Sequence, residues 1–240
     1  IKEWSEALMR IDAVEHDQVA AQDLFNAIVA FNGVLQPLAK QRRTQPADDL
    51  VSVWANADID GFTYDSIRLY DEVGLFIAGG AETTRTAISH GLRTFCDHPD
   101  QWNHLAAHPE AIPTAVEEVI RWVSPLNNFF RNAAADTSLA GADLAEGDRL
   151  ILLYPAANRD PRVFDDPNRF DTTRSPNPHL GFGQGTHFCI GANLARYELA
   201  ILFEELTKRI TGLSPVTEPD VEPNIFARAV RSFHLGFTLR

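Results

Sequence analysis

A single cysteine, Cys189, lies in a glycine-rich loop whose residue types could bind a metal or carry out nucleophilic chemistry. The loop covers residues 181 to 191 and reads Gly-Phe-Gly-Gln-Gly-Thr-His-Phe-Cys-Ile-Gly. Glycines at 181, 183, 185 and 191 allow positive φ and let a flat group approach the backbone closely. A helical pattern over residues 192 to 210 follows directly, and the positive end of that helix would favour a thiolate. The loop is therefore predicted to be a functional site.

The alternatives for Cys189 differ in what else they require from the sequence. A lone cysteine is most often a buried structural residue, but Phe182, His187 and the glycines around it favour a site. A zinc site lacks further paired ligands, and a phosphate-binding loop lacks a following Lys-Ser/Thr. A nucleophilic Cys–His enzyme stays open. Axial ligation of a haem fits best, because it needs one thiolate and a loop that can lie flat under a macrocycle.

A second segment, Gly79-Gly80-Ala81-Glu82-Thr83-Thr84, places polar groups in the middle of a long predicted helix. Two adjacent glycines in a helix interior cost about 1 kcal/mol each relative to alanine. They could permit a close crossing of two helices. Alternatively, they could mark a locally widened helix with a groove for a small ligand and water, into which Thr83 and Glu82 would relay protons.

A third set consists of charged residues that could order a long loop. Glu118 and Arg121 are spaced i, i+3 on a predicted helix, a pair that usually lies on the solvated surface and contributes little. Residues 155 to 180 are proline-rich with little periodicity, so they predict a long ordered loop that needs side-chain hydrogen bonds. Because a guanidinium offers five N–H donors, a buried cluster of Glu118, Arg121 and Arg169 would supply them.

The predicted elements indicate a mostly helical α+β protein. Apolar residues recur at helical spacing in the first part of the chain, and short alternating segments follow later. Helices are expected at 1–9, 18–43, 48–57, 65–97, 99–107, 113–123 and 192–210, strands at 129–134, 139–140, 149–153 and 230–238, and a turn at 58–61. We expect one domain over residues 1–240, with helices up to 123 and small sheet elements and the cysteine loop in 124–240.

Composition excludes several classes of function. The chain has 240 residues, of which 45% are hydrophobic, as in ordinary globular proteins. Its net charge of −12 argues against binding to nucleic acid or to an anionic membrane surface. The two cysteines, Cys96 and Cys189, form no disulfide framework, which indicates a reducing compartment. No apolar run reaches the length of a membrane span, so we expect a cytoplasmic protein.

Taken together and in this order, these motifs resemble the cytochrome P450 family. Residues 182 to 191 match the haem-binding signature Phe-x-x-Gly-x-His-x-Cys-x-Gly at every fixed position. The segment 79–84 is similar to the oxygen-binding motif of the family's long central helix. Glu118 and Arg121 match the family's Glu-x-x-Arg helix, and Arg169 lies where the third member of that triad falls. The resemblance implies the cytochrome P450 fold.

The resemblance also implies a role for each residue near the cofactor. Cys189 would be the proximal iron ligand of haem b, within a loop that includes Phe182, Gly183 and Gly191. His187 and Arg131 are similar to the family's haem-propionate partners.

Further residues resemble the family's catalytic and substrate-binding positions. Thr83 is similar to the oxygen-binding alcohol and Glu82 to its acidic neighbour in proton delivery. Other residues lie in stretches that line the substrate pocket of relatives: Phe76, Ile77, Gly80, Leu126, Asn127, Phe129 and Phe130, with a contribution from 228–230 in the tail.

The activity implied by the resemblance is insertion of one atom of dioxygen into a C–H bond of an apolar substrate. Similarity to actinobacterial members points to a sterol, terpenoid or branched lipid, with electrons from ferredoxin and ferredoxin reductase. A peroxide-driven peroxygenase is disfavoured because Glu82 and Thr83 are present. Intact members carry a long N-terminal portion, so we expect this chain, which starts at Ile1, to match somewhat more than their C-terminal half. The alternative is a truncated, non-catalytic haem-binding or structural fragment.

Overall fold

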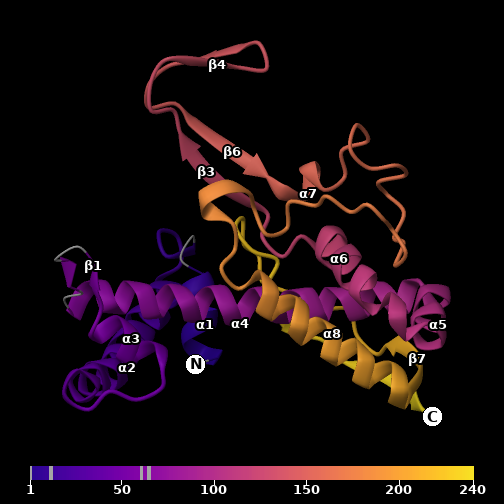
Figure 1. Cartoon of the computed structure of the whole chain (residues 1–240), viewed down its shortest axis with the longest axis horizontal. Coiled ribbons are helices and arrows are strands. Elements are labelled where there is room, and N and C mark those ends of the chain that lie inside the picture. Colours follow the sequence, from indigo (N-terminus) through magenta and orange to yellow (C-terminus); the bar gives the residue numbers. More distant parts are fainter. Residues whose placement is uncertain (1, 11–12, 60–61, 64–65) are drawn as a thin grey trace. The chain divides into compact units, whose positions relative to one another are not determined.

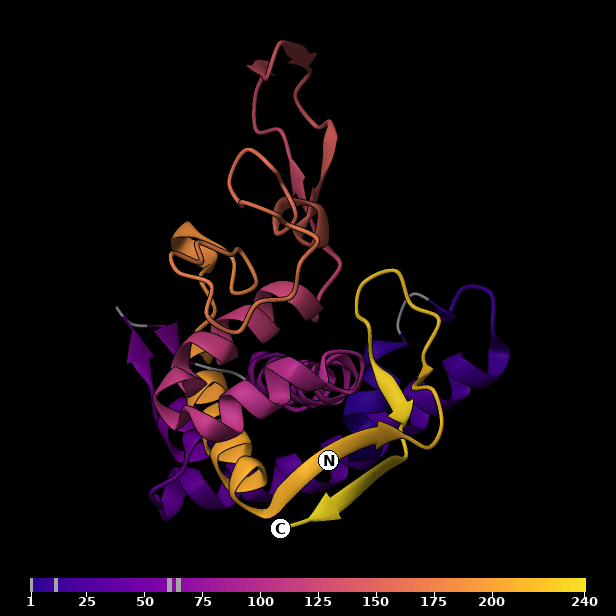
Figure 2. The same ribbon diagram turned by 90° about the vertical axis from the view of Figure 1, so that its right-hand side faces the viewer.

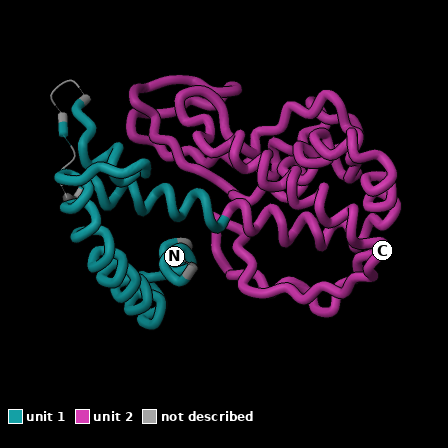
Figure 3. The backbone as a smooth tube through the Cα atoms, turned by 60° about the horizontal axis from the view of Figure 1, so that its bottom comes forward, with its two compact units in different colours: residues 1–82 teal, residues 83–240 magenta. Residues whose placement is uncertain are grey.

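The computed structural model describes the chain except for residues 1, 11–12, 60–61 and 64–65. The described residues divide into two compact units, residues 1–82 and residues 83–240 (Figure 3). The prediction of one domain over residues 1–240 stays a prediction. Ile1 and Asp65, expected to begin helices, and Asp60-Gly61 of the expected turn lie outside the described residues.

The first unit is built from helices. They are α1 (Lys2–Met9), α2 (Gln18–Thr44), α3 (Leu50–Ala55) and the first part of α4 (Ser66–Asp97), with a short antiparallel pair of β1 (Asp58–Ile59) and β2 (Phe62–Thr63). Asp17 begins α2 because its carboxylate accepts hydrogen bonds from the N–H groups of Val19 and Ala20. Buried apolar residues from α2 and α4 form the core of this unit: Leu35, Ala39, Leu69 and Val73.

The second unit packs its helices around α6. They are the remainder of α4, α5 (Pro99–Ala107), η2 (Pro109–Ala111), α6 (Ile112–Val123), α7 (Tyr154–Ala157), η3 (Gly185–His187) and α8 (Ala192–Arg209). The apolar stripe of α6 is buried against aromatic residues of α4, α8 and the loop after α7: Val116, Val119, Ile120, Val123, Phe95, Phe170 and Phe203. None of the described helices combines the length and the apolar character that crossing a membrane requires.

The strands of the second unit form separate antiparallel pairs. Strand β3 (Asn128–Asn132) pairs with β6 (Arg149–Leu153), and β4 (Thr137–Leu139) pairs with β5 (Ala142–Leu144) at the far end of this hairpin (Figure 1). After α8, β7 (Ile210–Pro215) pairs with β10 (Leu235–Leu239) (Figure 2). Strand β8 (Asp220–Val221) pairs with β9 (Val230–Ser232).

The mostly helical α+β prediction is confirmed, and the differences have local causes. Helix α5 and strand β6 have the predicted bounds, and residues 155–180 are irregular apart from the end of α7. The tail expected as one strand is divided into β9 and β10. Strand β7 was missed because it begins at the residue after α8, so the helical pattern runs into it without a break.

Candidate functional site

Cys189 lies at the N-terminal end of α8, in a loop bent by glycines. Gly183 and Gly185 both adopt φ of +73°, a conformation that favours glycine. The N–H of Cys189 donates to the carbonyl oxygen of Phe182 at 2.9 Å. Gly191 is the N-cap of α8 and provides no side-chain hydrogen bond, and a Cβ placed on it would lie 3.9 Å from Cys189 Sγ. The sulfur therefore lies beside the positive end of a helix, an environment suited to an anionic ligand atom.

Gly181 is required for close packing rather than for positive φ. A Cβ placed on Gly181 would lie 2.6 Å from Cγ2 of Ile120 in α6 and 3.4 Å from the Ile120 carbonyl oxygen. Of the loop's four glycines, only Gly183 and Gly185 use the positive-φ conformation, while Gly191 has φ of −86°. The loop is thus pressed directly against α6.

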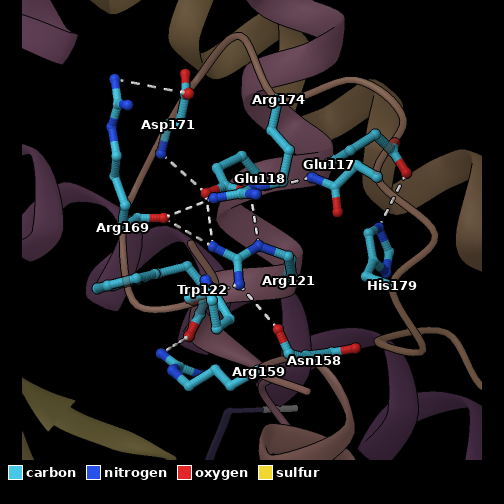
Figure 4. Close-up of polar contacts among 12 residues, drawn as sticks. Glu117, Glu118, Arg121, Trp122, Asn158, Arg159, Arg169, Asp171, Arg174 and His179 are labelled. Atoms are coloured by element: carbon cyan, nitrogen blue, oxygen red, sulfur yellow. Dashed lines mark hydrogen bonds and ion pairs between the residues drawn. The ribbon is translucent and has the colours of Figure 1, made fainter. Parts of the chain in front are cut away.

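A network of charged and aromatic side chains supports the loop from this side. The imidazole Nε2 of His179 lies 3.0 Å from Oε2 of Glu117 on α6, and Arg196 on α8 binds the same carboxylate through Nε at 2.7 Å. Because the N–H of Gly181 donates to Nδ1 of His179, Nε2 carries the proton that His179 donates to Glu117. The Arg196 guanidinium lies 4.5 Å from the ring centroid of Phe182. These contacts join α6, α8 and the segment 179–182 that leads to Cys189, and Figure 4 shows the contact between Glu117 and His179.

The Glu117 carboxylate is ionised at neutral pH. Burial alone would raise its pKa, but the hydrogen bonds from His179 and Arg196 outweigh burial and lower the pKa to about 2. The same hydrogen bond raises the pKa of Arg196 above its usual value. The network therefore keeps both charges over the whole physiological range.

Glu118 and Arg121 form a buried ion pair, so the surface interpretation of these two residues is wrong. Both side chains have 0% exposure, and Nε and Nη2 of Arg121 each lie 2.7 Å from a carboxylate oxygen of Glu118. The remaining donors of Arg121 bind main-chain carbonyls of the irregular segment, those of Asn158 at 2.8 Å, Pro167 at 2.9 Å and Arg169 at 3.1 Å. The predicted ordering of this segment by a buried guanidinium is confirmed.

The predicted third member of this cluster is wrong, because Arg174 takes the place expected for Arg169. The Arg169 side chain is 62% exposed and lies 3.8 Å from Asp171, and Figure 4 shows it pointing away from Glu118. The Arg174 side chain is 10% exposed, and its Nε lies 3.2 Å from Glu118 Oε2. Only the carbonyl of Arg169 joins the cluster, because the bend of the chain directs its main chain, and not its side chain, toward Arg121.

Asn158 links this cluster to the cysteine loop, a role that the sequence analysis missed. Its side chain is fully buried. Its Oδ1 accepts the N–H of Leu180 at 2.7 Å, and its Nδ2 donates to Ser124 Oγ at 2.9 Å. Because Leu180 directly precedes Gly181, the buried cluster fixes the start of the loop. The only sequence signal was its position in the proline-rich segment 155–180, which predicted an ordered loop.

His187 and Arg131, the expected propionate partners, are both exposed. His187 ends η3, and Arg131 lies on β3, where its Nη1 donates to the carbonyl of Phe130 at 2.8 Å. Neither side chain forms an ion pair with another described residue. Their predicted role stays a prediction.

The motif at 79–84 lies in an unbroken part of α4, so the expected widening of the helix is absent. A Cβ on Gly79 or Gly80 would meet no atom within 4 Å, so the close-crossing interpretation also fails within this unit. Glu82 is 2% exposed, and its Oε1 accepts a hydrogen bond from Ser5 Oγ of α1 at 2.8 Å. The next residue, Thr83, is the first of the second unit.

The predicted pocket residues of α4 pack within the first unit. The ring of Phe76 lies 4.7 Å from that of Trp54 in α3, in an edge-on arrangement. Ile77 packs against the core between α2 and α4. Gly80 is exposed, as is the large apolar side chain of Leu75, which the sequence analysis did not single out.

The predicted pocket residues around β3 do lie against the tail of the chain. Leu126 forms a bridge with Ala227, and the N–H of Asn127 donates to the carbonyl of Phe226 at 2.7 Å. The ring of Phe129 lies 5.2 Å from that of Phe226.

Phe130 faces the opposite side of the hairpin from Phe129, since side chains alternate along a strand. The Arg149 guanidinium lies 4.1 Å from the centroid of the Phe130 ring. Phe129 and Phe130 therefore have different surroundings, and their predicted place at a substrate pocket stays a prediction.

The residues around Cys189 fit a flat cofactor held by one sulfur. Cys189 forms no disulfide, and apolar side chains on either side of it are exposed, Phe188 at 49% and Ile190 at 85%. A Cβ on Gly185 would meet no atom within 4 Å, so the loop leaves open space beside it. Within the described ranges there is no group of three or more His, Cys, Asp and Glu residues arranged to hold a metal ion. A single thiolate under a macrocycle fits the residues around Cys189.

Comparison with known proteins gives a consistent result. Residues 110–225 match the family model of cytochrome P450. The chain is 37% identical over 238 residues to a steroid C26-monooxygenase of Mycobacterium tuberculosis, covering 98% of this chain and 64% of the relative. It is 39% identical over 210 residues to linalool 8-monooxygenase of Pseudomonas putida, covering 86% and 51%. The solved structure of Mycobacterium marinum cytochrome P450 CYP268A2 in complex with pseudoionone superimposes with a TM-score of 0.90 at 36% identity, covering 98% and 57%.

The chain thus spans about half to two thirds of the length of these relatives. The match extends over nearly all of this chain in the first and third cases, including α4, the cluster at Glu118 and the cysteine loop. The chain belongs to the cytochrome P450 family, whose members are haem-thiolate proteins with haem b as cofactor.

Proposed function

We propose that the protein is a haem-thiolate monooxygenase that inserts one atom of dioxygen into a C–H bond of an apolar substrate. The observation that carries the proposal is the Cys189 sulfur at the glycine-capped N-terminus of α8, in a loop supported by the buried Glu118–Arg121 pair and the partly exposed Glu117–Arg196 pair. When bound, the haem would supply dioxygen activation by a thiolate-ligated iron. The protein's part is to hold that group, exclude water and deliver protons.

The residues that would hold the haem lie in the second unit. Cys189 would provide the axial sulfur, and the backbone bends at Gly183 and Gly185 would let the macrocycle lie flat on the loop. The exposed side chains of His187 and Arg131 would bind the propionates. Phe182 and Gly191 would contribute to the same surface, Phe182 through the ring on which Arg196 stacks.

Glu82 and Thr83 would deliver protons. The Glu82 carboxyl is buried, and the hydroxyl of Ser5 donates to its Oε1 at 2.8 Å, so this acid is held in a fixed position. Thr83 follows it in α4 and offers a hydroxyl that both donates and accepts a hydrogen bond. We propose that Glu82 and Thr83 together deliver protons to the reaction site.

The substrate is proposed to be a steroid, a terpenoid or a branched lipid. Two relatives are named steroid C26-monooxygenase and linalool 8-monooxygenase, and one similar structure was solved with pseudoionone. The aromatic contact between Phe129 and Phe226 offers an apolar surface of the kind that such a substrate needs. Ferredoxin and ferredoxin reductase are proposed as the electron donors and the cytoplasm as the location, since the matching proteins are bacterial.

The spectrum of the reduced, carbon monoxide-treated protein tests the thiolate. The chain reconstituted with haem is expected to show the red-shifted Soret band of thiolate-ligated haem, and Cys189→Ser is expected to lose it. Cys96→Ser is the matched control, because Cys96 is the other cysteine of the chain and should leave the band unchanged. A thiolate band that survives in Cys189→Ser would refute the ligand assignment.

Turnover tests the proton delivery and the electron source. With NAD(P)H, ferredoxin and reductase, the parent protein is expected to hydroxylate a steroid or terpenoid, whereas Thr83→Ala should divert electrons to hydrogen peroxide. Thr84→Ala is the neighbouring control. Efficient turnover with hydrogen peroxide alone, without reductase, would favour a peroxygenase. Haem binding without turnover under either condition would favour the non-catalytic fragment.

A further inference from the structure

An open cavity of about 370 Å³ lies at the C-terminal end of α6, and the cysteine loop does not line it. Its walls come from the second unit, with Arg159 and Arg228 beside the apolar side chains of Val123, Pro219 and Val221. Pockets for small ligands have volumes of about 300–1,000 Å³ and combine an apolar wall with a few polar groups. This cavity therefore has the size and the mixed lining of a site for a small molecule.

The two carboxylates that line the cavity are already bound to Arg93, which lines it as well. Glu218 accepts hydrogen bonds from Nε and Nη2 of Arg93 at 2.8 and 3.0 Å, and Asp97 lies 2.5 Å from Nη1 of the same guanidinium. Within the described ranges, neither Arg159 nor Arg228 has a carboxylate within ion-pair distance. The cavity therefore carries positive charge that its own acids do not balance.

Both guanidiniums are anchored but keep donors available. Nη2 of Arg159 donates to the carbonyl of Trp122 at 2.9 Å, and Nη1 of Arg228 donates to the carbonyl of Val123 at 2.9 Å. These bonds satisfy carbonyls of the last turn of α6, which have no partner within the helix. A guanidinium has five N–H donors, and no nitrogen of either side chain is among the buried, unpartnered atoms found in the described residues. The donors that remain are thus open to a ligand.

The electrostatics of the cavity favour an anion. Burial lowers the pKa of Arg159, and the neighbouring charges of Arg121 and Arg228 lower it further. Burial likewise lowers the pKa of Arg228, and burial together with the Arg228 charge lowers the pKa of His90. His90 Nε2 lies 3.0 Å from the carbonyl of Arg228 and donates to it, so the imidazole holds this backbone in place as a neutral group. A negative charge between the two arginines would relieve their repulsion.

We propose that this cavity binds a small organic acid. Its carboxylate would bind Arg159 and Arg228 through charge-assisted hydrogen bonds, and its apolar body would lie against Val123, Pro219 and Val221. None of the residues proposed to hold the haem lines this cavity, and the proposal does not depend on monooxygenase activity.

Calorimetric titration of the chain with hexanoate tests the proposal. Hexanoate is expected to bind with one site per chain at constant ionic strength, and hexan-1-ol, which has a similar apolar body but no charge, is not. Arg228→Gln should weaken hexanoate binding by about tenfold or more, because a charge-assisted bond is lost. Arg162→Gln is the matched control, since this side chain is 87% exposed and pairs with Asp160. Equal affinity in the parent and in Arg228→Gln, or no binding of hexanoate at millimolar concentration, would overturn the proposal.

A variant that is expected to bind hexanoate more tightly completes the test, because a folding defect can weaken binding but cannot strengthen it. Glu218 is 72% exposed, and Glu218→Gln removes a negative charge from the cavity and frees donors of Arg93. Hexanoate is expected to bind this variant more tightly than it binds the parent chain, and weaker or unchanged binding would contradict the charge argument. Cys189→Ser should bind hexanoate like the parent, so failure of the haem proposal and failure of this proposal are distinguishable.

Discussion

Two groups of arginines around α6 are in opposite electrostatic situations. In the first group, Arg121 and Arg174 bind the Glu118 carboxylate, and their remaining donors bind main-chain carbonyls. At the C-terminal end, Arg159 and Arg228 bind carbonyls of α6 with no carboxylate beside them in the described part of the chain. A buried guanidinium with a carboxylate holds the backbone in place. A guanidinium without one keeps binding capacity for another molecule.

The largest effect is expected from removing the carboxylate of the first cluster. Glu118→Gln leaves Arg121 buried without a counter-charge and should lower the free energy of unfolding by about 3–5 kcal/mol. Urea denaturation followed by circular dichroism measures this change. Glu110→Gln is the control, because the Glu110 side chain is 73% exposed and should change stability little. A loss under about 1 kcal/mol in Glu118→Gln would show that the cluster is not a structural centre.

The next largest effect on stability is expected from one of two arginines in the irregular segment, Arg174, and not from the other, Arg169. Arg174→Gln should lower the free energy of unfolding by about 2–3 kcal/mol, because it removes a nearly buried charged donor to Glu118. Arg169→Gln should change it by less than about 0.5 kcal/mol, because that side chain is 62% exposed. The same denaturation measurement compares the two variants. A larger loss of stability in Arg169→Gln than in Arg174→Gln would show that Arg169 is the third member of the cluster.

A third effect is visible on acidification. Because the pKa of Glu117 is about 2 in the folded chain and 4.5 in its ordinary state, its carboxylate stabilises the fold above pH 4.5. That contribution, on the order of 2–3 kcal/mol, is lost as the pH falls from 4.5 toward 2. Unfolding free energies measured between pH 6 and pH 2.5 should therefore depend less steeply on pH in Glu117→Gln, by up to about 1.4 kcal/mol per pH unit. Parallel pH profiles of variant and parent would exclude this role.

The smallest effect is expected at the unbalanced end of α6. Arg159→Gln loses one hydrogen bond to the carbonyl of Trp122 but also relieves repulsion from Arg121 and Arg228. The free energy of unfolding should therefore fall by less than about 1 kcal/mol. Thermal denaturation at neutral pH measures the difference. A loss as large as that of Glu118→Gln would mean that both groups of arginines serve the fold in the same way.

Helices and strands were easier to predict from the sequence than contacts between side chains. The helices and the strand β6 follow from apolar periodicity and from flanking prolines, which act within a few residues. Glu118 and Arg121 could be paired because their spacing on a helix fixes their distance. Arg169 and Arg174 lie in a segment without periodicity, so nothing local indicates which guanidinium turns inward.

The residues missed at the site depend on contacts between distant segments. The hydrogen bond from Leu180 to Asn158 and the ion pair from Arg196 to Glu117 join positions far apart in the sequence. Each of these residue types is also common on a protein surface, so only the packed structure distinguishes them. The glycines of the loop were an exception, because their density alone marked it.

The convergence of three carbonyls on Arg121 has a consequence for the order of folding. The carbonyls of Asn158, Pro167 and Arg169 lie 37, 46 and 48 residues from Arg121 along the chain. These three bonds need the Arg121 guanidinium in place, so we expect the segment between Asn158 and Arg169 to become ordered only after α6 has formed. Mutations in this segment are then expected to accelerate unfolding more than they slow folding.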